Sequence, residues 1–269
     1  MKYTIFLLRS LFKSSLMMAI AVSFGLSGFL SCVSLPKNIR SEMLPRVDTR
    51  APVDAFALVV TEHTILPDTC TGDVTEETCL KIIKTLPPIT QNGIGSGLLI
   101  KAKRGPIFLT AAHVCASDTP DFYETSGIRI SLKTKMKITL RERSGKFINT
   151  KILKIDHKKD LCALMPDTIY TQPVEWSEDS PKVGDKVYAI SAPHGINGPE
   201  MSLIFEGFYS GKIGGIRHYT IPTRPGSSGS IVLNDNFKGV GMLNAAYISM
   251  ESIGIGTGHK DIKEFIDSI

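Results

Sequence analysis

The sequence has little excess charge of either sign and few aromatic residues. Its 269 residues carry a net charge of +5, and Phe, Trp and Tyr together make up 7% of them. No recognition-helix or base-stacking motif accompanies this mild positive charge. We therefore expect no nucleic-acid partner, although the charge would favour contact with an anionic surface.

Helical periodicity and internal repeats are also scarce. Apolar side chains recur at helical spacing only in the last dozen residues, at Ile262, Phe265, Ile266 and Ile269. Elsewhere short apolar segments are separated by turns, with 23 Gly and 15 Pro in the chain. This pattern argues against alternating strands and helices, and predicts an all-β barrel or sandwich with a C-terminal helix docked on it.

The clearest strand signal covers residues 128–140. Apolar residues alternate there with basic ones, so one face is predicted to be buried and the other solvated. A first strand is predicted over 55–60, and residues 61–92 are predicted to form a loop. Shorter strands are predicted over 95–100, 106–112, 147–155, 161–164, 186–191, 202–208, 218–223, 230–233 and 237–243.

The N-terminus reads as an export segment. Lys2, Arg9 and Lys13 precede an uncharged apolar stretch over 14–30, the pattern of a signal peptide. The following Ser31-Cys32 resembles a bacterial lipoprotein signal, which would make Cys32 the lipid attachment site. The alternatives are an uncleaved anchor and ordinary cleavage with secretion.

The chain is therefore predicted to divide into a signal over 1–32, a polar tether over 33–53 and a folded domain over 54–269. We expect an exported protein of the cell envelope or periplasm, associated with the membrane through its N-terminus, or else secreted.

Four cysteines remain once Cys32 is set aside. An even number in an exported chain suggests disulfides, and four cysteines allow three pairings. Cys70 and Cys79 bracket a short polar turn, which favours a local bridge. Cys115 and Cys162 could form the second bridge or be buried free thiols.

Three segments carry the residues of chemical interest. His113 ends an apolar strand, Asp160 opens an apolar run, and Ser228 lies in the glycine-flanked turn Gly226-Ser227-Ser228-Gly229. A buried carboxylate needs a partner, and an imidazole N–H is a suitable one. The turn could present a hydroxyl together with the backbone N–H groups of Gly226 and Ser228, as an oxyanion hole requires.

Taken together, these segments resemble the trypsin/chymotrypsin superfamily of serine peptidases. The residues T-A-A-H, D-L-x-A-L and G-S-S-G-S appear in the family's order. The segment over 183–195 is similar to the bacterial HtrA-like branch, and Ser230 to the glutamyl-endopeptidase branch. No PDZ module is expected after the domain. The resemblance implies two six-stranded antiparallel β-barrels with the site between them.

The resemblance also implies roles for individual residues. His113 would be the general base, Asp160 would orient it, Ser228 would be the nucleophile, and Gly226 and Ser228 would form the oxyanion hole. Ser227 stands where trypsin-like zymogens have an aspartate, so activation by a new N-terminus is not expected.

The resemblance further implies a substrate-binding region formed by Pro222, Thr223, Arg224, Leu243, Asn244 and Ala245. Pro222 carries no charge, which favours small or aliphatic substrate side chains. An inward-turned Arg224 would instead favour acidic ones.

The sequence thus predicts an exported serine endopeptidase acting on protein or peptide substrates, without a cofactor or metal. Two alternatives are a catalytically inactive binding module on the same fold and a structural lipoprotein in which the serine turn is fortuitous.

Overall fold

The computed structural model describes residues 51–116, 120–247 and 249–269. The predicted signal, most of the predicted tether and Cys32 lie outside these ranges. Within them, no helix combines the length and apolar character that a membrane crossing requires.

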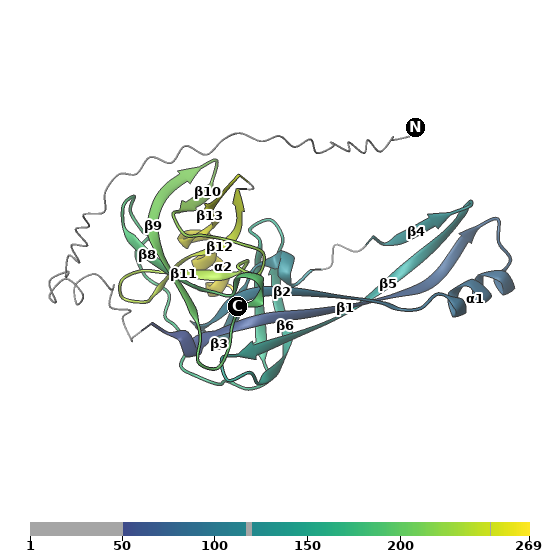
Figure 1. Ribbon diagram of the computed structural model, residues 1–269, viewed down its shortest axis with the longest axis horizontal. Coiled ribbons are helices and arrows are strands. Elements are labelled where there is room, and N and C mark those ends of the chain that lie inside the picture. Colours follow the sequence, from purple (N-terminus) through teal and green to yellow (C-terminus); the bar gives the residue numbers. More distant parts are fainter. Residues whose placement is uncertain (1–50, 117–119, 248) are drawn as a thin grey trace, which may run out of the picture. The chain divides into compact units, whose positions relative to one another are not determined.

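The described chain forms two closed six-stranded antiparallel β-barrels, as predicted (Figure 1). The first barrel follows the order β1-β2-β3-β7-β6-β5 and closes by pairing β1 with β5. Its strands are β1 (Phe56–Gly72), β2 (Ile89–Ala102), β3 (Gly105–Thr110), β5 (Ile128–Glu142), β6 (Phe147–Asp156) and β7 (Leu161–Pro166).

The second barrel follows the order β10-β13-β12-β11-β8-β9. Its strands are β8 (Lys186–Ser191), β9 (Leu203–Ile213), β10 (Ile216–Tyr219), β11 (Ser230–Leu233), β12 (Gly239–Tyr247) and β13 (Met250–Gly258). The predicted C-terminal helix is α2 (His259–Asp267), and it buries Ile262, Phe265 and Ile266.

The alternation over residues 128–140 produces the expected two-faced strand. Ile130, Ile138 and Leu140 of β5 are buried, whereas Lys133 and Lys137 are exposed. Side chains on a strand point alternately to opposite faces, so this spacing turns the apolar set toward the barrel interior.

The prediction of a loop over 61–92 is wrong. Strand β1 continues to Gly72, which pairs with Ile128 of β5 well beyond the end of its pairing with β2. The short strand β4 (Phe122–Thr125) pairs with the start of β5, and helix α1 (Glu76–Thr85) follows β1. Figure 1 shows these segments extending from the first barrel, and we call them the arm.

Local sequence features stabilise the N-terminal end of helix α1. The Thr75 side chain caps it by accepting a hydrogen bond from the Thr78 N–H at 3.3 Å, and Glu76 and Glu77 lie in its first turn, where negative charge stabilises a helix. None of its residues is buried.

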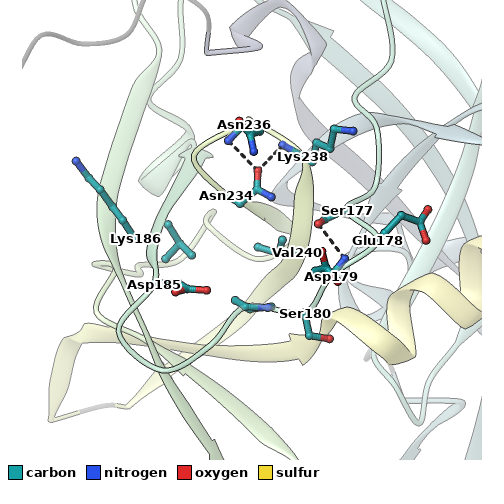
Figure 2. Close-up of a pocket in the computed structure, with 12 residues that line it drawn as sticks. Ser177, Glu178, Asp179, Ser180, Asp185, Lys186, Asn234, Asn236, Lys238 and Val240 are labelled. Atoms are coloured by element: carbon teal, nitrogen blue, oxygen red, sulfur yellow. Dashed lines mark hydrogen bonds between the residues drawn. The ribbon is translucent and has the colours of Figure 1, made fainter.

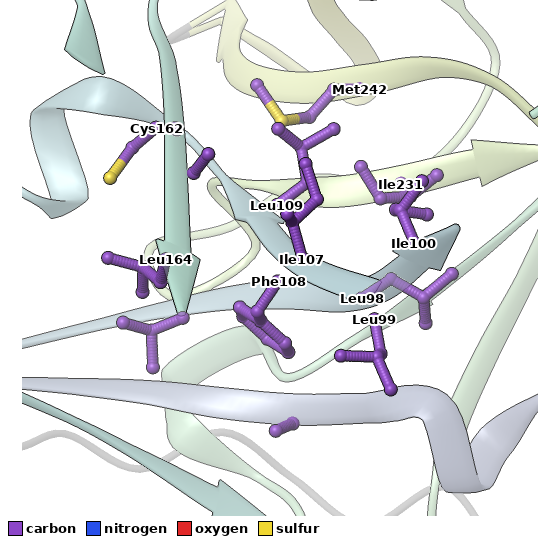
Figure 3. Packing of buried hydrophobic residues seen from close by; sticks show 14 of the residues in the cluster. Leu98, Leu99, Ile100, Ile107, Phe108, Leu109, Cys162, Leu164, Ile231 and Met242 are labelled. Atoms are coloured by element: carbon purple, nitrogen blue, oxygen red, sulfur yellow. The ribbon is translucent and has the colours of Figure 1, made fainter. Parts of the chain in front are cut away.

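The larger apolar core is continuous from one barrel into the other. Figure 3 shows Ile231 and Met242 of the second barrel close to Ile100 and Leu109 of the first. All four side chains are at most 2% exposed. This packing fixes the facing edges of the two barrels, where the predicted site residues lie.

The predicted Cys70–Cys79 disulfide is present, and of the two alternatives for Cys115 and Cys162 the structure has the disulfide. Cys70 bonds to Cys79 in the arm, and Cys115 bonds to Cys162 in the core of the first barrel. The second bridge joins the segment after His113 to the start of β7, two residues beyond Asp160. It therefore ties together the two chain segments that hold the predicted base and its carboxylate partner.

Replacing Cys115 and Cys162 with Ala should destabilise the protein more than replacing Cys70 and Cys79. A disulfide stabilises a protein by lowering the conformational entropy of the unfolded chain. This contributes about 4 kcal/mol to the free energy of unfolding for a bridge spanning 47 positions, and about 3 kcal/mol for one spanning 9. The first replacement also leaves cavities in a fully buried site. Denaturant unfolding without reductant measures both losses, and an equal or larger loss for the arm bridge would contradict the expectation.

Candidate active site

His113 lies in the 3₁₀ turn Ala112–Val114 that follows β3. Ala112 and Val114 are buried, while the side chain of His113 is 45% exposed. The apolar neighbours thus anchor the turn in the core, so that the imidazole ring is held at the surface of the first barrel.

Asp160 ends the turn between β6 and β7 and faces His113. Its Oδ2 lies 2.9 Å from Nδ1 of His113, and its Oδ1 accepts from the His113 backbone N–H at 3.0 Å. Asp160 has φ = +53°, the left-handed conformation that short polar residues tolerate best. The structure therefore brings together the first two residues of the predicted triad.

The surroundings of Asp160 keep its carboxylate ionised. Burial alone would raise the pKa of Asp160, but the hydrogen bonds from His113 and Asn244 outweigh that effect and hold the pKa below its ordinary value. An ionised Asp160 is the form that accepts a proton-bearing Nδ1 and stabilises an imidazolium.

Asn244 on β12 connects Asp160 to Ser228. Its side-chain Nδ2 donates to Asp160 Oδ2 at 2.5 Å and to the Asp160 carbonyl at 3.2 Å. The backbone carbonyl of Asn244 accepts a hydrogen bond from the Ser228 hydroxyl at 3.0 Å. The sequence pointed to Asn244 only as a substrate-binding residue, and nothing local in the sequence reveals this second set of contacts.

The serine turn is held by its own backbone. The Ser227 N–H donates to the Arg224 carbonyl at 2.8 Å, and the buried Ser227 hydroxyl accepts from the Arg224 N–H at 3.3 Å. Ser227 therefore takes part in a local turn at the position where a trypsin-like zymogen would have a charged partner for a new N-terminus.

The orientation of the peptide before Gly226 suits an oxyanion hole. The Pro225 carbonyl accepts from the His194 N–H at 2.7 Å, on the side of the turn toward the loop after β8. A trans peptide points its C=O and N–H in opposite directions, so the Gly226 N–H is directed the other way. Gly226 has φ = +94°, which a residue with a side chain would adopt only under strain.

The residues predicted to bind substrate fall into two groups. Thr223 and Leu243 are buried, whereas Pro222 and Ala245 are exposed. Arg224 forms an ion pair with Glu251 of β13, and the Thr223 N–H donates to the Glu251 carbonyl at 2.9 Å. The sequence did not predict a role for Glu251. Its carboxylate neutralises the charge of the Arg224 guanidinium and fixes the position of that group.

A hollow of about 310 Å³ lies away from these residues, between the segment 177–187 and the turn 234–240. Figure 2 shows its polar side chains. Asn234 Oδ1 accepts from the N–H groups of Asn236 and Lys238, and the Asp179 N–H donates to the Ser177 hydroxyl. These contacts stabilise loops. Ser180 also lines the hollow, and its hydroxyl lies 3.0 Å from Nδ1 of the buried His259, whose Nε2 lies 2.7 Å from the Ser177 carbonyl oxygen.

In the part of the chain that the structure describes, no three His, Cys, Asp or Glu side chains are grouped so as to hold a metal ion.

Comparisons with known proteins agree with this geometry. No curated protein matches the sequence. The fold is similar to that of a variant of the HtrA-type protease AlgW solved with a decapeptide, at a TM-score of 0.58 and 18% identity. That match covers 80% of this chain and 63% of the other.

The trypsin-like peptidase domain family matches residues 95–242, more than half of the chain, and this range includes His113, Asp160 and Ser228. The family match supports a protease function of the serine type. The chain belongs to the trypsin-like peptidase domain family.

Proposed function

We propose that this chain is an exported serine endopeptidase that cleaves peptide bonds through an acyl-enzyme on Ser228. The hydrogen-bonded series from His113 through Asp160 and Asn244 to Ser228 carries the proposal. The two disulfides support export, because such bonds persist in oxidising compartments. The decapeptide with the structural neighbour supports a peptide substrate.

His113 acts as the general base. Its Nδ1–H donates to Asp160, which fixes the tautomer whose basic nitrogen is Nε2. As the Ser228 oxygen attacks the scissile carbonyl carbon, Nε2 removes the hydroxyl proton. His113 then gives this proton to the leaving amine as the C–N bond breaks, and the acyl group stays on Ser228.

Water completes the cycle by hydrolysing the acyl-enzyme, with His113 again transferring the proton. It attacks the ester carbonyl, its proton passes to His113, and the same proton returns to the Ser228 oxygen as the acid leaves. During both attacks, negative charge develops on the carbonyl oxygen. The N–H groups of Gly226 and Ser228 stabilise that charge.

Substrate binding releases the nucleophile. The Ser228 hydroxyl donates to the Asn244 carbonyl. This carbonyl belongs to Leu243–Ala245 of β12, a segment that would pair with the substrate backbone as an added strand. A substrate N–H that takes this carbonyl frees the hydroxyl to turn toward His113. The turn itself needs no N-terminal processing of the trypsin kind, since the Ser227 hydroxyl already accepts a hydrogen bond from the Arg224 backbone N–H.

Ser228→Ala should abolish hydrolysis, with a loss in kcat on the order of 10⁶-fold, because the attacking oxygen is removed. Ser230→Ala is the matched control. Ser230 is buried in the next strand, and its hydroxyl has no hydrogen-bond partner among the described residues. It should keep wild-type activity.

An organophosphonate serine probe distinguishes the alternatives. It should label wild type and Ser230→Ala but not Ser228→Ala. Folded wild-type protein that resists the probe and cleaves no peptide would instead be a binding module.

Asp160→Asn should lower kcat on the order of 10⁴-fold, because the amide no longer holds the correct histidine tautomer. Its effect on stability should depend on pH. The folded pKa of Asp160 lies below the unfolded value of about 3.9, so the unfolded state binds more protons between the two.

The stability supplied by the Asp160 carboxylate is therefore complete above about pH 5 and is lost as the pH falls through the folded pKa. Denaturant unfolding of wild type and Asp160→Asn from pH 3 to 8 measures the difference. A difference that already shrinks between pH 7 and pH 5 would contradict the assigned shift.

Cleavage should follow small or aliphatic residues. The side chains of Thr223 and Leu243 both pack against Gly254, so closely that a Cβ added there would lie 2.5 Å from Thr223 Oγ1. A binding region formed by these residues would leave little room for a large substrate side chain. Arg224 forms an ion pair with Glu251, so its charge is not available to bind an acidic substrate side chain.

A peptide library profiles this preference directly. Glu251→Gln should increase cleavage after acidic residues several-fold by releasing Arg224. Glu62→Gln removes the same charge at an exposed position of β1 and serves as the charge control. A wild-type preference for acidic residues would refute the assignment.

A further inference from the structure

Ser96 is a fully buried serine on β2 that contacts the serine turn of the other barrel. Its backbone N–H donates to the Ser228 carbonyl at 2.8 Å, and its hydroxyl donates to the Gly226 carbonyl at 2.8 Å. The same hydroxyl accepts from the Ala192 N–H at 3.0 Å. No motif in the sequence singles out Ser96, which lies 130 positions from Gly226.

The Ser96 hydroxyl joins the two segments that set the direction of the Gly226 N–H. One is the serine turn, held at the Gly226 carbonyl. The other is the loop after β8, held at Ala192, two residues before the His194 N–H that binds the Pro225 carbonyl. Both peptide groups that flank Gly226 are thereby fixed, one by His194 and the other by Ser96.

Only a group that donates and accepts at one point fits between these segments. The Gly226 carbonyl needs a donor and the Ala192 N–H needs an acceptor, and a hydroxyl supplies both. Gly226 has no side chain to restrict its backbone, so its flanking peptides rotate readily when a hydrogen bond is lost. Thr110 in turn holds Ser96, because its hydroxyl donates to the Ser96 carbonyl at 2.7 Å.

We propose that Ser96 is a positioning residue for catalysis, which holds the Gly226 N–H toward the oxyanion through its hydrogen bonds to Gly226 and Ala192. The proposal rests on the proposed peptidase function. Ser96 does not touch the substrate. It acts on the transition state alone, since the misplaced N–H would matter most when charge develops on the carbonyl oxygen.

Ser96→Ala should therefore lower kcat about 10- to 100-fold and leave KM within about 3-fold, because an oxyanion donor is misplaced rather than deleted. Ser191→Ala is the matched control. Ser191 is also buried, it precedes Ala192, and its hydroxyl has no partner among the described residues. It should retain wild-type kcat.

A second readout separates positioning from general destabilisation. Wild type should hydrolyse a peptide ester far faster than the matching thionoester, because the hole is shaped to hydrogen-bond oxygen. Ser96→Ala should reduce this ratio about 10-fold. Ser96→Cys keeps a donor and acceptor at this point, but its thiol is larger and weaker in both roles, so it should give an intermediate ratio.

The outcomes are distinct. Wild type that neither hydrolyses the ester nor reacts with the serine probe overturns the peptidase function and the role of Ser96 with it. Active wild type with an unchanged kcat and ester ratio in Ser96→Ala overturns the role of Ser96 alone. If Ser96→Ala does not fold at 25 °C, as judged by circular dichroism, a wild-type ratio in Ser96→Cys overturns it equally.

Discussion

The hydrogen bond from the Ser96 N–H to the Ser228 carbonyl crosses from one barrel to the other, and the site depends on it. The proposed base His113 and its partner Asp160 belong to the first barrel, while the proposed nucleophile Ser228 belongs to the second. Gly229 permits the close approach, since a Cβ there would overlap the Ser96 carbonyl and the Thr110 hydroxyl. Main-chain contact, reinforced by the shared apolar core, thus sets the position of Ser228 relative to His113.

The barrels could be predicted because their strands have local causes. Alternation along β5 and the apolar runs of β7 and β11 each specify a strand without reference to a distant partner. The arm could not be predicted in this way. The distal part of β1 is polar and partly exposed, and its extended form comes from pairing with β5, more than fifty positions away.

The same distinction applies to the site. His113, Asp160 and Ser228 each lie beside a strand signal, and their order along the chain carries the resemblance to a known family. Ser96 lies in a predicted strand, but neither it nor Glu251 belongs to a motif that indicates a role in the site. Ser96 acts because folding brings it to a turn in the other barrel, and Glu251 because β13 lies beside the segment of Arg224.

Asn244 has a consequence for how variation at this site would be interpreted. Its amide holds the carboxylate of Asp160, and its carbonyl holds the hydroxyl of Ser228. If β12 pairs with a peptide substrate as proposed, the same strand would both align the substrate and influence the proton affinity of Asp160. Under the proposed function, a substitution at Asn244 that changed the substrate preference would also change the rate of bond cleavage, because one residue contacts both Asp160 and Ser228.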